Sequence, residues 1–387
     1  TPLADILYHS GMKLLEYQAK SLFDEADITT PASWHVGTVA EAVQAAHGIG
    51  YPVYIKAQVR TSGRMKAGGV KTATSDAETR AVVGEMLDST VRGLPVESVL
   101  VEETIDGNDE LYLGITMDRA AGQPVLMLSA SGGIDVETAA TEGAMTRVPI
   151  DPVYGLYPYQ VRQAVTEAGI DAVDAQPLTR VAMQLYNLWT AYDGTEIEIN
   201  PLVITGSGLV ALDAVFNIDD DALFRQPQLD AETDVPADPL ERKAAEYDLE
   251  YVRLDGSIGV IGNGAGLVMA TLDLIDHVGG TPANFLDVGG GADADRIGNA
   301  LSLVFEDPNV DVVLFTIFGG ITRCDEVAAG LNAVVATHET LPAPLVVRLA
   351  GTNQQAGLNT LNDDRITVET DLDAAVRRAV DLAREHP

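Results

Sequence analysis

Cysteine, histidine and basic residues are scarce in this sequence. The single cysteine, Cys324, excludes an internal disulfide and any metal site built from several thiolates. The six histidines form no group with the spacing of a zinc site. No apolar run reaches the roughly 18 residues of a membrane span, and no basic segment leads into an apolar core as in a secretory signal. These absences predict a cytoplasmic protein.

Acidic residues outnumber basic residues by 58 to 24, which gives a formal charge of −34. A field of this sign repels nucleic acids and anionic membranes, so neither is expected as a partner. The acidic residues are spread along both halves of the chain rather than gathered in one tail. We therefore expect a surface adapted to concentrated salt, where the screening length falls to about 3 Å at molar ionic strength.

The length of 387 residues, with 46% apolar content, is sufficient for two or three domains with separate cores. Residues 226–239 are polar and rich in proline, which predicts a boundary between domains. We place one domain at residues 12–237 and a second at residues 245–387. Residues 1–11 show no strong pattern, and we expect them to be an extension outside the fold.

The second domain repeats an apolar strand, a glycine-rich loop and a helix, with strands at Ile258–Ile261, Asn284–Val288, Val312–Ile317 and Leu345–Leu349. Near-continuous apolar strands separated by helices are typical of a parallel sheet covered on both faces. Ligands of such sheets bind beyond the carboxyl ends of the strands, where these loops lie. Each loop alone is explained equally well as a tight turn, but several at one edge favour an anion site at helix N-termini. Cys324 begins a helix there and is expected to be a small buried residue rather than a nucleophile.

The segment Thr195–Leu202 alternates apolar and polar residues, and a second short apolar run surrounds Asp213. The intervening turn at residues 206–208 predicts a β-hairpin. In such a hairpin the amide oxygen of Asn200 and the carboxylate of Asp213 are two hard oxygen ligands. Mg²⁺ on a nucleotide is held by one or two such groups, with phosphates and waters completing its shell. The alternative for this segment alone is an ordinary hairpin with polar residues on its solvated face.

A second, distant group of residues favours the nucleotide hypothesis. Lys56 interrupts the otherwise apolar strand Pro52–Val59, and a buried amine is costly without an anionic partner, for which a phosphate is suitable. The flexible, cationic loop Thr61–Gly69 follows directly and has backbone NH groups that can close over phosphates. Glu102, at the end of the next strand, and Glu110, at the start of another, are candidate acceptors for ribose hydroxyls or an adenine amine.

Several segments, taken together and in order, resemble the β subunits of succinyl-CoA synthetases, and the resemblance covers nearly all of the chain after Met12. They are residues 12–23 (MKLLEYQAKSLF), 56–59 (KAQV), 63–71 (GRMKAGGVK), 110–114 (ELYLG), 197–202 (IEINPL), 222–227 (ALFRQP) and 318–324 (FGGITRC). The resemblance implies an α/β fold with an ATP-grasp domain followed by a flavodoxin-like CoA-ligase domain with a parallel sheet.

The resemblance also implies a role for individual residues. The residues implied to contact ATP or ADP are Lys56, Gly63, Arg64, Met65, Glu102, Ile105 and Glu110. Asn200 and Asp213 are implied to hold Mg²⁺, and Glu198 to steady a phosphohistidine. The carboxylate substrate, succinate, is implied to bind at Asn263, Gly320, Ile321 and Thr322.

The activity implied by the family is the reversible formation of succinyl-CoA from succinate, CoA and ATP. In this family the phosphohistidine and the main CoA site belong to a separate α subunit, which is therefore the expected partner. The chain departs from the family at Met65, where a glycine is common, at Arg60, where relatives carry histidine, and at Val215, where relatives carry lysine. Two alternatives stay open: the β subunit of a malate-CoA ligase, and a nucleotide-binding regulatory subunit without turnover.

Overall fold

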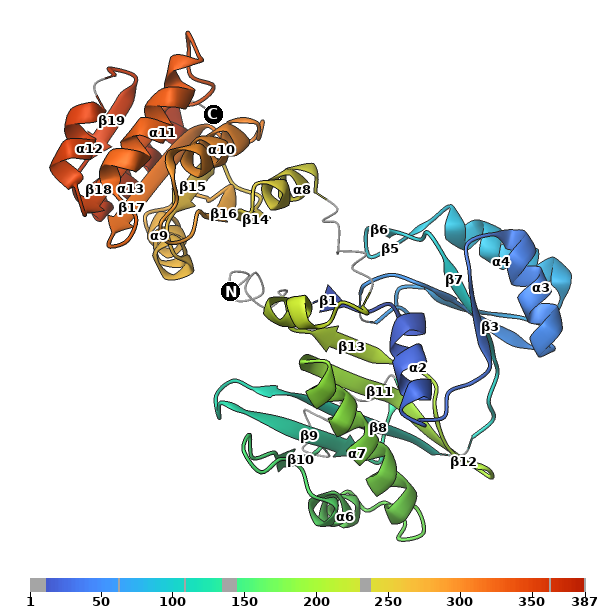
Figure 1. Cartoon of the computed structure of the whole chain (residues 1–387). Helices are drawn as coiled ribbons and strands as arrows, with labels where there is room; N and C mark the ends of the chain where they lie inside the picture. The colour runs from blue at the N-terminus through green and yellow to red at the C-terminus, as the bar shows by residue number, and fades with distance from the viewer. Residues whose placement is uncertain are drawn as a thin grey trace. The chain divides into compact units, whose positions relative to one another are not determined.

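The computed structural model describes residues 12–61, 63–107, 109–133, 145–229, 238–361 and 363–385. The expected extension at residues 1–11, and residues 230–237 of the predicted boundary segment, lie outside these ranges. The chain divides into two compact units, one formed by residues 9–234 and the other containing residues 235–387 (Figure 1). Each unit has its own sheets and its own core, and each is described by itself below.

The first unit contains a small antiparallel sheet with two helices on one face (Figure 1). Its strands, in spatial order, are β2 (Ser33–Val36), β7 (Val99–Glu103), β3 (Val53–Ala57) and β4 (Val70–Ala73), and its helices are α3 (Val39–Ile49) and α4 (Asp76–Leu87). The hydroxyl groups of Thr38 and Ser75 cap the two helices by accepting hydrogen bonds from backbone NH groups. The two short strands β5 (Thr90–Val91) and β6 (Leu94–Pro95) pair with each other.

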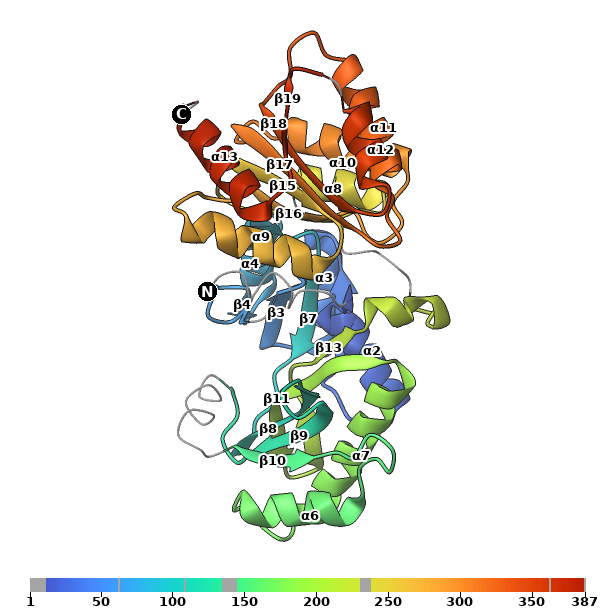
Figure 2. The same ribbon diagram turned by 90° about the vertical axis from the view of Figure 1, so that its left-hand side faces the viewer.

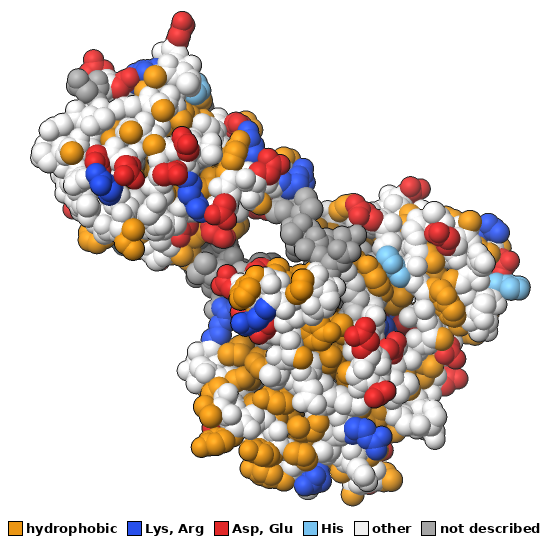
Figure 3. All heavy atoms as spheres, viewed as in Figure 1, with side chains coloured by type: hydrophobic (Ala, Val, Ile, Leu, Met, Phe, Trp, Pro, Cys, Tyr) orange, Lys and Arg blue, Asp and Glu red, His pale blue; other side chains and the backbone are white. Residues whose placement is uncertain are grey.

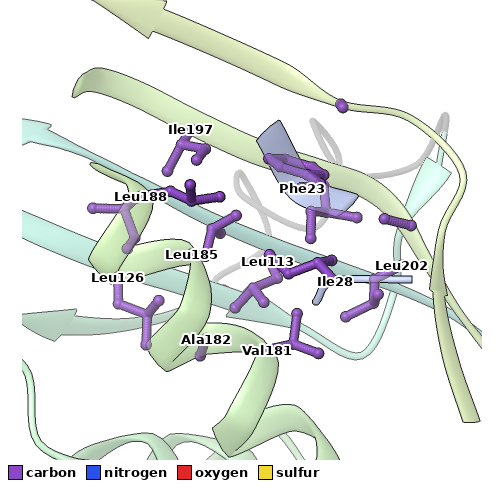
Figure 4. Close-up of a cluster of buried hydrophobic side chains, with 14 of the residues drawn as sticks. Phe23, Ile28, Leu113, Leu126, Val181, Ala182, Leu185, Leu188, Ile197 and Leu202 are labelled. Carbon is purple, nitrogen blue, oxygen red and sulfur yellow. The ribbon is translucent and has the colours of Figure 1, made fainter. Parts of the chain in front are cut away.

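A larger antiparallel sheet forms the rest of the first unit. Its strands, in spatial order, are β1 (Met12–Lys13), β13 (Val215–Ile218), β11 (Gly194–Thr205), β8 (Asp109–Asp118), β9 (Gln123–Ser129) and β10 (Thr146–Pro149), with β12 (Gly208–Ala211) beside β11. The helical elements are α2 (Glu16–Glu25), α6 (Pro158–Glu167), α7 (Ala175–Ala191) and the 3₁₀ helix η2 (Asp220–Arg225). Figure 4 shows the core, in which Leu113 and Ile197 of the sheet meet Leu185 of α7 and Phe23 of α2.

The second unit is a six-stranded sheet with helices on both faces (Figure 2). Its strands, in spatial order, are β14 (Glu250–Arg253), β16 (Asn284–Asp287), β15 (Ile258–Gly262), β17 (Val312–Gly319), β18 (Leu345–Gly351) and β19 (Ile366–Glu369). Its helices are α8 (Pro239–Glu246), α9 (Ala265–His277), α10 (Ala294–Phe305), α11 (Cys324–Ala336), α12 (Gln354–Thr360) and α13 (Leu372–Glu385). The predicted parallel sheet is confirmed, and the edge strand β14, which the pattern did not reveal, pairs antiparallel with β16.

Burial on both faces explains why the strands of the second unit read as continuous apolar runs. Along β17, Val312 and Leu314 join the core formed with α9 and α13, whereas Val313 and Phe315 join the core formed with α10 and α11. Alternate side chains therefore enter opposite cores, and neither face of the strand needs polar residues. Cys324 is fully buried at the start of α11, in agreement with the expectation that it is a small packed residue.

Acidic side chains are scattered over the visible surface of both units, interspersed with fewer basic ones (Figure 3). This distribution agrees with the sequence, in which no single segment carries the negative charge. Within the described ranges, no helix has the length and apolar character needed to cross a membrane.

Candidate functional site

A cavity of about 820 Å³ lies inside the first unit, and its two larger sheets both contribute to the wall. This volume is within the range of roughly 300–1,000 Å³ that is usual for small-molecule sites. The cavity brings together most of the residues that the sequence singled out: Lys56, Gly63, Arg64, Met65, Glu102, Glu110, Glu198, Asn200 and Asp213. Ile105 follows β7 and stands outside the set of described residues that line the cavity.

Strand alternation explains why these polar side chains face one space. On β11, Ile197 and Ile199 enter the core against α7, so Glu198 and Asn200 on the opposite face point to the cavity. Lys56 occupies the corresponding face of β3. The predicted hairpin is confirmed by the antiparallel pairing of β11 with β12, and Asp213 lies just beyond the end of β12, after Leu212.

Lys56 is almost fully buried, with 7% of its surface exposed. Its ammonium group donates to Glu16 Oε1 at 2.9 Å and to the Leu212 carbonyl at 2.6 Å, and lies 2.7 Å from Glu102 Oε1. The sequence suggested a phosphate as the partner of this amine, but in the structure the partners are two carboxylates and a carbonyl. Burial would lower the pKa of Lys56, but the negative charges of Glu16 and Glu102 outweigh burial and raise it, so the amine stays charged.

Arg64, in the loop after β3, contacts helix α2 and the segment between β12 and β13. One guanidinium nitrogen lies 2.9 Å from Glu16 Oε2, and another donates to Asp213 Oδ1 at 2.6 Å. Burial would lower the pKa of Arg64, but the two carboxylates raise it. Gly63 precedes Arg64 in this loop. Its φ is +68°, and a Cβ at this position would lie 2.7 Å from a guanidinium nitrogen of Arg92. The positive φ favours glycine at this position.

The sequence suggested Glu102 as an acceptor for ribose or adenine. In the structure Glu102 lines the cavity, and its carboxylate is paired with lysines. It is 1% exposed, and its two oxygens contact the amines of Lys56 and Lys20. Glu110 is different, because it is exposed at the cavity wall and keeps the position expected of a ligand acceptor. Met65 is also exposed there.

The two proposed metal ligands fit a nucleotide-bound Mg²⁺. Asn200 and Asp213 both line the cavity and offer amide and carboxylate oxygens, the donors that Mg²⁺ prefers. At present Asn200 Oδ1 accepts a hydrogen bond from Gly133 N at 2.6 Å. Within the described ranges, no three acidic, histidine or cysteine side chains gather into a metal-binding group. The donor set therefore suits an ion that takes its remaining ligands from phosphates and water.

Glu198 is the carboxylate with the most perturbed protonation in the cavity. Burial, reinforced by the charge of neighbouring Glu196, raises the pKa of Glu198 to about 7. The Tyr112 hydroxyl donates to Glu198 Oε2 at 3.0 Å and partly opposes this rise. Gly114 allows this arrangement, since a Cβ there would lie 2.9 Å from the Tyr112 hydroxyl oxygen. Glu198 can thus gain or lose a proton near neutral pH.

In the second unit, Asn263 and Thr322 come together at the carboxyl edge of the sheet. The Asn263 amide accepts from Phe318 N at 2.9 Å and donates to the Phe318 carbonyl at 3.1 Å and to Thr322 Oγ1 at 3.4 Å. Thr322 Oγ1 also accepts from Gly291 N at 3.0 Å. Asn263 thus fixes the loop that follows β17.

The rest of that loop is open to solvent. Gly320 is exposed, and Ile321 is 84% exposed. Part of the predicted anion site is already filled by the protein itself, because Asp287 Oδ1 accepts from Gly264 N at 2.6 Å and from Gly289 N at 2.7 Å. At the start of α9, the backbone NH of the N-cap residue Gly264 therefore binds an internal carboxylate.

Sequence reasoning gave no role to Glu16 and Lys20, although both are buried beside the cavity and contact Lys56 or Glu102. A signal was present, because the two residues are four positions apart on α2 and share a face with Phe23, which is buried. A charged pair on an apolar helix face indicates buried partners elsewhere in the chain.

Two family models match the sequence: one described as an ATP-grasp domain, over residues 13–204, and one described as a CoA-ligase, over residues 261–382. "Succinate--CoA ligase [ADP-forming] subunit beta" of Natronomonas pharaonis is 54% identical over 378 residues, covering 97% of this chain and 100% of that protein. The protein of the same name from Haloarcula marismortui is 53% identical over 379 residues, covering 97% and 99%.

More distant proteins agree with these matches. The protein of the same name from Rubrobacter xylanophilus is 44% identical and covers 97% of this chain and 99% of its own length. Among solved structures, ATP citrate lyase from Methanothrix soehngenii, in complex with citrate and coenzyme A, superposes with a TM-score of 0.75. The identity is 18%, over 96% of this chain and 100% of that chain, so this likeness shows a common fold.

Proposed function

Because the chain belongs to the family of ADP-forming succinate–CoA ligase β subunits, we propose that its first unit binds Mg·ATP or Mg·ADP in the 820 Å³ cavity. The chain is one subunit of a multi-subunit acid–thiol ligase, with an ATP-grasp domain followed by a CoA-ligase domain. The observation that carries the proposal is the convergence of Lys56, Arg64, Asn200 and Asp213 on one space.

The residues divide the work by their chemistry. Lys56 and Arg64 supply positive charge toward the phosphates, and Glu110 accepts hydrogen bonds from the nucleoside. Mg²⁺, when held by Asn200 and Asp213, neutralises charge that develops on the phosphates. Phosphoryl transfer requires little more from a protein than positioning and electrostatic stabilisation, which matches this set of groups.

Glu198 is proposed to orient the imidazole of the histidine that carries the phosphoryl group. A carboxylate with a pKa of about 7 can accept a hydrogen bond from an imidazole NH and can stabilise its charge as the phosphoryl group moves. None of the histidines in the described part of the chain lines the cavity; these are His35, His47, His277 and His338. As the family resemblance implies, we assign the phosphohistidine and the main CoA site to a partner α subunit.

The loop containing Gly320, Ile321 and Thr322, with Asn263 beneath it, is the proposed site for the carboxylate substrate. Backbone NH groups of an exposed loop near the start of α11 can bind a carboxylate, and Asn263 holds the loop in place. Succinate is favoured over malate because the relatives are named as succinate–CoA ligase subunits. The intact set of charged groups around Glu198 also disfavours a regulatory subunit without turnover.

The test is turnover by the purified complex of this chain with its α subunit, in molar salt, with ATP and CoA. Succinate, malate and other dicarboxylates are compared by the specificity constant for acyl-CoA formation. The highest value is expected with succinate. A higher value with malate would assign the malate-CoA ligase function, and no turnover with any acid would contradict the enzyme proposal.

A further inference from the structure

Glu16 lies at the centre of a buried cluster of charges behind the cavity wall. Its Oε1 is 2.9 Å from the amine of Lys20 and 2.9 Å from that of Lys56, and its Oε2 is 2.9 Å from Arg64. Glu16 is 2% exposed and is not among the described residues that line the cavity. Its carboxylate therefore reaches the cavity only through side chains that do line it.

We propose that Glu16 is a positioning residue, whose carboxylate holds the positive charge of Lys56 in place at the cavity and orients the Arg64 guanidinium to bind the phosphates of the nucleotide. This inference rests on the proposed nucleotide site and adds a residue to which neither the sequence nor the family matches gave a role. Glu16 acts through the two cations.

The hydrogen-bond geometry shows how completely the amine of Lys56 is held. An ammonium group has three donors, and those of Lys56 are taken by Glu16, Glu102 and the Leu212 carbonyl. Lys20 contacts the same three residues from the other side. The two lysines are therefore held as a pair by shared acceptors, and Glu16 is the acceptor that also reaches Arg64.

Charge balance gives the reason for a carboxylate at this position. The cluster contains three cations, Lys20, Lys56 and Arg64, and three carboxylates, Glu16, Glu102 and Asp213. Burial would raise the pKa of Glu16, but the charges of Arg64, Lys20 and Lys56 hold it well below the ordinary value, so Glu16 is ionised. Loss of that charge leaves three buried cations with two carboxylates, and their repulsion is strong in a medium of low polarity.

Of these ion pairs, the one between Arg64 and Asp213 is the most open to the cavity, because the Asp213 side chain is 35% exposed. If Asp213 held a metal, the Arg64 nitrogen that contacts Asp213 would become available for the phosphates. The other guanidinium nitrogen would keep its contact with Glu16 during this exchange. Glu16 would thus hold Arg64 in place while Asp213 binds the metal.

The experiment compares Glu16→Gln with Glu25→Gln, a matched loss of charge at an exposed position on the same helix, α2. Both variants are prepared as the full complex with the α subunit in molar salt, and Mg·ADP binding is titrated by calorimetry. Glu16→Gln is expected to raise the dissociation constant by about tenfold or more, while Glu25→Gln leaves it unchanged. A purely structural role for Glu16 lowers the number of active sites but leaves the dissociation constant of the folded protein unchanged, and that result would overturn the proposal.

Arg64→Lys keeps the inference testable if Glu16→Gln does not fold. Lysine retains the charge but lacks the planar fork that reaches Glu16 and Asp213 together. Mg·ADP is therefore expected to bind about tenfold more weakly, and unchanged binding would contradict the exchange at Arg64. Failure of the wild-type complex itself to bind Mg·ADP would instead refute the proposed nucleotide site, so the two failures are distinguishable.

Discussion

Replacement of Glu198 by glutamine is expected to stabilise the protein while it impairs catalysis. The pKa of Glu198 is raised from 4.5 to about 7, mainly by burial, so the folded protein opposes its ionisation. At about 1.4 kcal/mol per pKa unit the shift corresponds to roughly 3 kcal/mol, and partial exposure of the side chain reduces the expected gain to about 2 kcal/mol. Glutamine keeps the shape and removes this cost.

The direction of the pH dependence follows from the raised pKa. Below the unfolded-state pKa near 4.5 the carboxyl group is neutral in both states, and glutamine gives no advantage. As the pH rises, the unfolded chain ionises first, and the wild type loses stability until the folded group also ionises, at a pH of about 7. The advantage of Glu198→Gln therefore grows from about pH 5 to about pH 7 and is constant above that.

Both tryptophans of the chain, Trp34 and Trp189, belong to the unit that contains Glu198, so their fluorescence reports the unfolding of that unit. Denaturant titrations at several pH values, in molar salt, measure the difference in unfolding free energy between variant and wild type. Glu97→Gln is the matched control, because Glu97 is an exposed carboxylate in the same unit. A gain for Glu198→Gln that does not change with pH, or a loss of stability, would refute the reasoning.

Two further predictions concern the metal and the salt. Asp213→Ala is expected to weaken Mg·ADP binding by tenfold or more in calorimetry, because the variant lacks one of the two proposed metal ligands. The circular dichroism spectrum is expected to be unchanged, because the Asp213 side chain faces the cavity and Arg64 keeps its contact with Glu16. Unchanged affinity would remove Asp213 from the metal site. The melting temperature is expected to rise by several degrees from dilute buffer to molar salt, because salt screens repulsion among 58 acidic residues, and a melting temperature independent of salt would contradict the salt-adapted surface.

The spacing of apolar residues along the sequence was sufficient to predict the strands that surround the candidate sites. The alternation in residues 195–200 and the apolar run around Asp213 predicted the β11–β12 hairpin, although β12 ends at Ala211, before Asp213. The strands separated by glycine-rich loops predicted the parallel sheet of the second unit. Both signals are local, because side-chain direction follows directly from the strand repeat. The antiparallel edge strand β14 was missed because the pairing direction of an edge strand leaves no trace in such a pattern.

The partners of the charged residues could not be predicted in the same way. The amine of Lys56 meets Glu16, 40 positions earlier, and the guanidinium of Arg64 meets Asp213, 149 positions later. Such pairs depend on how distant helices, strands and loops of the first unit pack together, which no local pattern encodes. The pattern indicated that Glu102 contacts a ligand, but it gave no sign that the carboxylate of Glu102 also holds two lysines.

The central claim is that the cavity delivers a phosphoryl group to a histidine on another subunit. The most direct test incubates this chain, alone and together with its α subunit, with Mg·ATP labelled in the γ-phosphate, and follows acid-labile label on each chain. We expect label on the α subunit only, dependent on this chain and reduced by Asp213→Ala. Stable label on this chain in the absence of the α subunit would contradict the account and place the phosphoryl carrier among its own six histidines.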